Sequence, residues 1–258
     1  MTTTYVSEAI AEIKKALIES NLSKINDYAN NESYQTYVRL VINEHFMIDK
    51  FAQINNDFIR QQLIKTNNAS SYYKEWAKTG SFLVKSKLIE HGHCLDTLIN
   101  DEDSAIRLNI VDKDPNYWPL IMNKSNIEFY YASEWLKSQE QINLKLLDSI
   151  LKIFIKKKNP QLYQALTLKH QAMTHTPTTI EKTMTTRQLC AMGSPLWAKD
   201  MSIQEIIDIN KYITKVKENH LDAHIPELVM LLFKNLQIYW HIIIDDFIEK
   251  HNHEKKIT

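Results

Sequence analysis

Glycine is scarce in this chain of 258 residues, with only Gly80, Gly92 and Gly193 present. Rossmann folds and P-loops cluster glycines beside phosphate groups, because the backbone N–H groups must approach them closely. We therefore expect neither a dinucleotide site nor a P-loop. Only six prolines occur, and the scarcity of both helix-breaking residues favours helices throughout the chain.

Cysteine, net charge and long apolar runs are also lacking. Two cysteines are too few for a disulfide framework, which indicates a reducing, cytoplasmic setting. The net charge is +0, whereas dedicated nucleic-acid binders are usually basic. No window reaches the roughly 18 apolar residues needed to span a bilayer, and residues 1–10 do not have the pattern of a secretory signal. We expect no membrane partner.

A six-residue pattern recurs five times in the first half of the chain. Each copy starts with an aliphatic residue, and most copies continue with a basic one. The copies are 38–43, 59–64, 84–89, 106–111 and 127–132, at steps of 21, 25, 22 and 21 residues (59−38, 84−59, 106−84, 127−106). A period of this length is typical of a solenoid, whose units bury their apolar faces by stacking on their neighbours.

Each of the first four copies is followed by an apolar cluster and then by polar residues. The clusters are 48–51, 73–76, 95–98 and 118–121, and the polar residues are 55–57, 81, 100–104 and 125–126. Ser, Asn and Asp side chains accept hydrogen bonds from the free N–H groups at a helix start. This recurring order predicts a cycle in which each repeat unit has a cap, a helix, a loop and an apolar cluster. Ile106 and Ile110 are predicted to lie in the core.

This cycle resembles the short α-repeats of the leucine-rich-repeat-variant and HEAT-like group, whose units carry an acidic cap, a Val-Arg helix start and a Leu-rich second element. The resemblance covers residues 33–141, and it implies a right-handed helical solenoid with a binding role and no catalytic residues. We predict an all-α fold, a HEAT-like short-repeat α-solenoid with a C-terminal helical module. The predicted domains are 1–32, 33–141 and 142–258.

Apolar periodicity predicts further helices outside the repeats. They are an amphipathic helix at 5–19, an apolar helix from 144 to about 159, and helices at 161–173 and 202–218. Residues 21–32 are polar and predict a connector. A nearly apolar helix at 226–250 is a candidate interface for homo-oligomers. The sequence does not decide whether 174–187 is ordered.

Four basic residues share the second position of the repeated pattern. They are Arg39, Arg60, Lys85 and Arg107. Stacked repeats would set them in a row that contacts a phosphate backbone or an acidic strip of a protein. Alternatively, they pair with cap carboxylates such as Asp57 or Asp103 and tie neighbouring units together.

Aromatic residues are frequent in the repeat region. Tyr and Trp are enriched among the residues that contribute most to binding at protein interfaces. We predict that the partner-binding residues are the four basic ones together with Tyr73, Trp76 and Trp118.

Three groups of polar residues are candidates for chemistry. His91, His93 and Cys94 lie close in sequence, and His220 and His224 are four residues apart, but neither group has the remaining ligands of a zinc site. We therefore expect no metal and no cofactor. His241 with Asp245 could act as a general base, although a polar pair in the core is the commoner role. No catalytic motif supports an enzyme.

The sequence thus predicts a protein-binding adaptor or inhibitor. Abundant Lys, Asn and Ile indicate an AT-rich genome and hence a bacterial or phage protein, which would neutralise a host or rival enzyme. The first alternative is a HEAT-like nucleic-acid binder that uses the basic row. The second alternative is an enzyme with a His/Asp site.

Overall fold

The computed structural model describes residues 3–139, 141–233 and 240–257. All regular structure in these residues is helical, and they contain no strand, which confirms the predicted all-α class. The chain divides into two units, Met1–Leu120 and Ile121–Thr258. The division falls within the predicted 33–141 domain.

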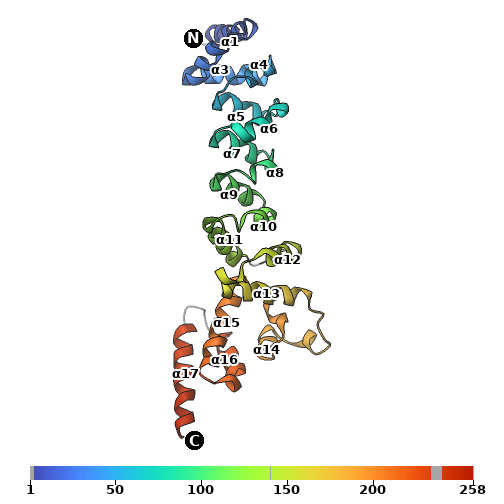
Figure 1. Cartoon of the computed structure of the whole chain (residues 1–258), viewed down its shortest axis with the longest axis vertical. Helices are drawn as coiled ribbons and strands as arrows, with labels where there is room; N and C mark the ends of the chain where they lie inside the picture. The colour runs from blue at the N-terminus through green and yellow to red at the C-terminus, as the bar shows by residue number, and fades with distance from the viewer. Residues whose placement is uncertain (1–2, 140, 234–239, 258) are drawn as a thin grey trace. The chain divides into compact units, whose positions relative to one another are not determined.

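The first unit alternates longer and shorter helices (Figure 1). They are α1 (Thr3–Ile18), α2 (Leu22–Asn30), α3 (Glu32–Asn43), α4 (Ile48–Ala52), α5 (Asp57–Lys65), α6 (Tyr73–Thr79), α7 (Phe82–Glu90), α8 (Leu95–Leu98) and α9 (Ser104–Lys113), and α10 (Trp118–Ile121) covers the boundary. The longer helices α3, α5, α7 and α9 each pack on the next, and α4, α6 and α8 each contact the longer helix that follows.

A polar cap starts each longer helix. The N-caps of α3, α5, α7 and α9 are Asn31, Asn56, Ser81 and Asp103, and each side chain accepts a hydrogen bond from a backbone N–H two or three residues on. The last three were predicted as caps and are confirmed. Ile59, Val84 and Ile106 each follow their cap by three residues and are buried. Ile110 is buried too, so the predicted core positions of α9 are confirmed.

The caps test the predicted register of the first and last copies. Val38 follows its cap Asn31 by seven residues, although the middle copies begin three residues after theirs. In the last copy the cap is Ser125, so Ile127 is only two residues on and is 55% exposed. Glu128 takes the inward position instead and is buried. The first copy keeps its inward face, because Val38 is buried one turn further from its cap than the middle copies begin, whereas the predicted register of the last copy was wrong. Apolar spacing alone does not locate the first turn of a helix.

The predicted connector at 21–32 is also wrong, because α2 lies there. Asn21 caps this helix and accepts a hydrogen bond from the Lys24 amide at 3.1 Å. Ile25 and Ala29, one turn apart, are buried where α2 packs on α1 and α3. Two apolar residues at helical spacing are enough for this short helix, because neighbouring helices stabilise it. The predicted helix at 5–19 is confirmed as α1.

The second unit contains α11 (Asn126–Ser138), α12 (Leu144–Ile153), α13 (Pro160–Thr174), α14 (Thr186–Ala191), α15 (Ile203–Glu218), α16 (Ile225–Leu232) and α17 (Trp240–Ile257). α13 packs on α12 and α15, and α15 also contacts α11 and α16. The helices predicted at 161–173 and 202–218 are confirmed as α13 and α15.

Two predicted helices of this unit end differently. α12 ends at Ile153, because Phe154 has extended backbone and packs its ring 5.3 Å from that of Phe129. The predicted single helix at 226–250 is wrong, because the stretch holds nearly all of α16 and the start of α17. Part of it, 234–239, lies outside the described residues. None of the described helices is both long and apolar enough to cross a membrane.

The segment between α13 and α15 is organised around one carboxylate. Glu181 accepts hydrogen bonds from the Ser194 hydroxyl at 2.6 Å and the Thr178 amide at 2.8 Å, and it lies 3.2 Å from the His175 ring. These contacts lower the pKa of Glu181 from 4.5 to about 2, the Ser194 hydroxyl contributing most. The 174–187 segment, which the sequence left open, therefore has a defined polar centre.

The packing of α7 predicts that two leucines of one helix differ sharply in their contribution to stability. Leu88 is 0% exposed and Leu83 is 57% exposed. We expect Leu88→Ala to lower the free energy of unfolding by roughly 2–5 kcal/mol, and Leu83→Ala to change it by less than about 0.5 kcal/mol. Chemical denaturation of both variants measures this. Equal effects would contradict the assigned inward face of α7.

The contacts of Glu181 predict a pH-dependent contribution to stability. Because its pKa is lowered in the folded chain, ionised Glu181 contributes stability above its ordinary pKa of 4.5, and this is lost as pH falls towards about 2. We expect Glu181→Gln to lower the melting temperature at pH 6, and the difference from the wild type to vanish near pH 2. Thermal unfolding from pH 6 to 2 tests this, with the exposed Glu218→Gln as control. A difference that stays constant over this range would contradict it.

Candidate functional site

The predicted basic row contains three equivalent residues, not four. Arg60, Lys85 and Arg107 each follow the N-cap of their helix by four residues. Arg39 follows its cap by eight, so it lies about one turn further along its helix. It is exposed, with its guanidinium 6.0 Å from the centre of the Phe58 ring. The sequence pattern placed Arg39 in the row because it does not show the extra turn at the start of α3.

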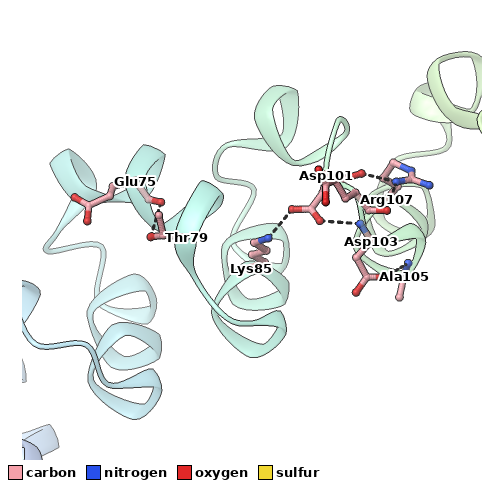
Figure 2. Close-up of polar contacts among 8 residues, drawn as sticks. Glu75, Thr79, Lys85, Asp101, Asp103, Ala105 and Arg107 are labelled. Carbon is pink, nitrogen blue, oxygen red and sulfur yellow. Dashed lines mark hydrogen bonds and ion pairs between the residues drawn. The ribbon is translucent and has the colours of Figure 1, made fainter.

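Two members of the row hold the loop that precedes α9 (Figure 2). The Lys85 ammonium, from α7, donates to the Asp101 carboxylate at 2.7 Å. Arg107, from α9, donates to the backbone carbonyl of Asp101 and, at 2.9 Å, to that of Glu102. The Asp103 amide completes the loop by donating to the Asp101 carboxylate at 3.0 Å. Lys85 therefore joins α7 to this loop, and Arg107 fixes the loop against its own helix, α9.

The Asp101 carboxylate is suited to this role. Burial alone would raise its pKa, but the hydrogen bonds from Lys85 and the Asp103 amide outweigh burial and lower the pKa below its ordinary value. The carboxylate is thus ionised at neutral pH. Asp101 and Lys85 side chains are 11% and 17% exposed, and screening by salt is weaker for such partly buried pairs than for surface pairs.

Arg60 is buried against an aromatic ring. It is 7% exposed, and its guanidinium lies 5.6 Å from the centre of the Trp76 ring, a cation–π distance. Its Nε atom has no hydrogen-bond acceptor among the described residues. The suggested partner Asp57 instead accepts from the Ser81 hydroxyl at 2.6 Å. Arg60 thus contributes to packing between α5 and α6.

The aromatic residues predicted to bind a partner lie in the core. Tyr73, Trp76 and Trp118 are each at most 3% exposed. The Tyr73 hydroxyl donates to the Leu63 carbonyl at 3.3 Å, and the Trp76 ring stacks on Tyr72. In this structure their side chains are not available to a partner. The short helices α6 and α10 offer few other large apolar side chains. These aromatic rings therefore fill the core.

An exposed aromatic face lies on α11, where the sequence analysis did not place one. Ile127, Tyr130 and Tyr131 share one side of the helix, at spacings of three and four residues, and are 55%, 61% and 52% exposed. The two tyrosine rings meet edge to face, 5.7 Å apart. The opposite side, including Phe129, is buried. Counting from the Ser125 cap, which the sequence does show, would have identified this face.

The first histidine group does not form a ligand set. The His93 ring packs 4.7 Å from the Tyr73 ring, and the His91 ring lies 6.4 Å from His93. Burial raises the pKa of the Cys94 thiol and lowers that of His93. A protonated thiol is a poor metal ligand. Cys94 also has left-handed backbone geometry (φ 56°), so it serves as the entry to α8.

The second histidine pair is divided by the structure. His220 is exposed at the end of α15, whereas His224 lies beside Glu227 and His251. Ligand atoms of these three residues lie within 4.8 Å of one another, which no other group of three histidine, cysteine or carboxylate residues achieves in the described ranges. Sequence reasoning missed this cluster because His251 is 24 residues beyond Glu227 (251−227).

The His241 and Asp245 pair considered for catalysis lies on the surface. Both residues are exposed on α17, and the Asp245 carboxylate accepts from the Lys215 ammonium of α15. A general base with a raised pKa is usually buried. This pair has neither a cleft nor burial to support acid–base chemistry.

A cavity of about 800 Å³ in the second unit is lined by Lys137, Lys169 and Ser202, among others. Lys169 is 2% exposed, and its ammonium donates to the carbonyls of Lys199 and Met201 at 2.6 and 2.5 Å. Burial lowers its pKa. Because backbone carbonyls take these two hydrogen bonds, Lys169 joins α13 to the turn before α15, a structural role.

The contacts of the basic residues predict different effects for two arginines. We expect Arg107→Ala to lower the free energy of unfolding by roughly 1.5–3 kcal/mol, because it removes charged hydrogen bonds to two carbonyls. Arg39→Ala should lower the free energy of unfolding by less than about 1 kcal/mol, which is the contribution of an exposed cation–π contact. Urea denaturation compares them. A larger loss for Arg39→Ala would refute this assignment.

Comparison of the chain with protein-family models, with curated proteins and with solved structures finds no match. The resemblance of residues 33–141 to HEAT-like repeats therefore stays a prediction from the sequence pattern.

Proposed function

We propose that the protein is a helical-repeat adaptor or inhibitor that binds another protein through the exposed aromatic face of α11. The first unit is proposed to be a short HEAT-like solenoid. Support for this comes from the order of packing, in which α3, α5, α7 and α9 follow one another, each started by a polar cap. Repeats of this kind commonly present a surface to a partner.

The observation that carries the proposal is the set of Ile127, Tyr130 and Tyr131. Each is more than half exposed although it is apolar or aromatic. Tyrosines contribute large contact area at low entropic cost and are enriched at protein interfaces. The partner should therefore offer an apolar groove for the two rings, with acceptors for their hydroxyl groups at its rim.

The position of the basic residues argues against the nucleic-acid alternative. Arg60 and Arg107 are at most 8% exposed, and Lys85 pairs with Asp101. Phosphate binding depends on accessible cations that release counterions when they neutralise phosphates. We therefore propose a protein as the partner. The wild-type chain should not shift single- or double-stranded DNA or RNA in a mobility assay at physiological salt.

Substitutions on α11 test the proposal. The wild-type chain, immobilised, is used to capture a protein from cells of the source organism, and the captured protein is then purified. We expect the Tyr130→Ala/Tyr131→Ala variant to bind it at least about 10-fold more weakly, since hot-spot residues typically contribute 2 kcal/mol or more. Isothermal titration calorimetry measures the affinity.

Ile18→Ala is the matched control, because Ile18 is 64% exposed but lies on α1. Its affinity should equal that of the wild type, and circular dichroism should show that all variants keep their helix content. Unchanged binding by the double tyrosine variant would refute the α11 surface. Capture of nucleic acid alone, with no protein, would refute protein binding as the function.

A further inference from the structure

We propose that His224, Glu227 and His251 form a zinc-binding site in the second unit, independent of the α11 surface. His224 and Glu227 lie at the start of α16, and His251 lies on α17. Imidazole nitrogen and carboxylate oxygen are preferred zinc ligands, and two histidines with one glutamate make up the protein ligands of one common kind of zinc site.

The hydrogen bonds of His251 identify the atom that would bind the metal. Its Nδ1 lies 2.8 Å from the carbonyl oxygen of Phe247. A carbonyl only accepts, so Nδ1 carries a proton and donates. In the neutral ring the lone pair is then on Nε2, which faces the Glu227 carboxylate at 3.3 Å. Two electron-rich atoms at this distance require a cation or a proton between them.

The donor distances suit a tetrahedral ion. Zinc bonds to nitrogen and oxygen of about 2.0–2.1 Å place two ligand atoms of a tetrahedron about 3.3 Å apart. Nε2 of His251 lies 3.3 Å, and Nδ1 of His224 lies 3.7 Å, from the same Glu227 oxygen. All three ligand atoms lie within 4.8 Å of one another, so side-chain rotations that bring them closer would complete the coordination.

The surroundings have the features of a supported metal site. Zinc-bound histidines usually donate their other ring N–H to a carbonyl or carboxylate, and this hydrogen bond fixes the ring. The Nδ1–H group of His251 donates to the Phe247 carbonyl in this way. The His251 ring also packs between those of His224 and Phe247, with centroids 4.1 and 4.3 Å away. His251 is 3% exposed, so its position is fixed before a metal binds.

The site also has an accessible side. The Glu227 side chain is 49% exposed and that of His224 is 38% exposed. Three protein ligands leave the fourth tetrahedral position to a water molecule or to a partner's side chain. Bound zinc would link the first turn of α16 to α17, two elements whose connection along the chain passes through residues 234–239.

Zinc titration of the full-length chain tests the site. The protein is treated with EDTA, desalted and titrated with zinc chloride at pH 7.4 by isothermal titration calorimetry. We expect one zinc ion per chain with micromolar or tighter affinity, and a melting temperature that rises with zinc because only the folded chain binds it. Glu227→Gln and His224→Gln should each weaken binding at least about 10-fold.

Control variants separate this site from other histidines. His220→Gln and His241→Gln change exposed histidines outside the cluster and should bind zinc as the wild type does. Because Glu227 and His224 are accessible, their variants are expected to keep the fold, which circular dichroism checks. Absence of stoichiometric zinc binding would overturn the proposal. Binding that both cluster variants retain would also overturn it.

Discussion

The hydrogen bond from a cap side chain to the first turn of each longer helix is the constraint on which the rest of the first unit depends. Asn56, Ser81 and Asp103 accept from the amides of Ile59, Val84 and Ala105. The cap fixes where the helix begins, and each further residue turns the side chain by about 100°. The cap therefore decides which residues enter the core, which reach the next helix and which face solvent.

The basic residues four positions after the caps illustrate this consequence. Lys85 reaches the Asp101 carboxylate, Arg107 reaches the carbonyls of the loop that precedes its own helix, and Arg60 packs against Trp76. Burying a charge is unfavourable unless hydrogen bonds, an opposite charge or a ring compensate it. The three residues use three different compensations, and Lys85 and Arg60 each connect their helix to another element of the first unit, whereas Arg107 fixes the loop before its own helix.

The two proposed sites depend on different physical features of the second unit. The α11 surface is an excess of exposed apolar area on a helix whose other side is well packed. The cluster at His251 is instead a buried imidazole ring whose nitrogen lone pair faces a carboxylate. One feature favours a protein with an apolar groove, and the other favours a cation. Neither site requires the other to be occupied.

Local patterns in the sequence predicted the features that depend on local physics. Scarce glycine and proline predicted the all-helical class, apolar spacing predicted α1, α13 and α15, and polar residues predicted the caps of α5, α7 and α9. These features arise within about one turn of helix, where the interacting residues are neighbours in sequence. The same locality explains the error at α2, whose two buried residues are a weak pattern until α1 and α3 cover them.

Tertiary structure decided which of the aromatic residues are accessible. Trp76 and Trp118 are in the core, while Tyr130 and Tyr131 are outside it. All four residues are aromatic, and the packing of their helices places two of them inside and two outside. The meeting of Glu227 with His251 likewise needs α17 to lie against α16. Contacts between residues far apart in sequence leave no periodic pattern in the sequence. The local sequence around each of the two residues is that of an ordinary helix.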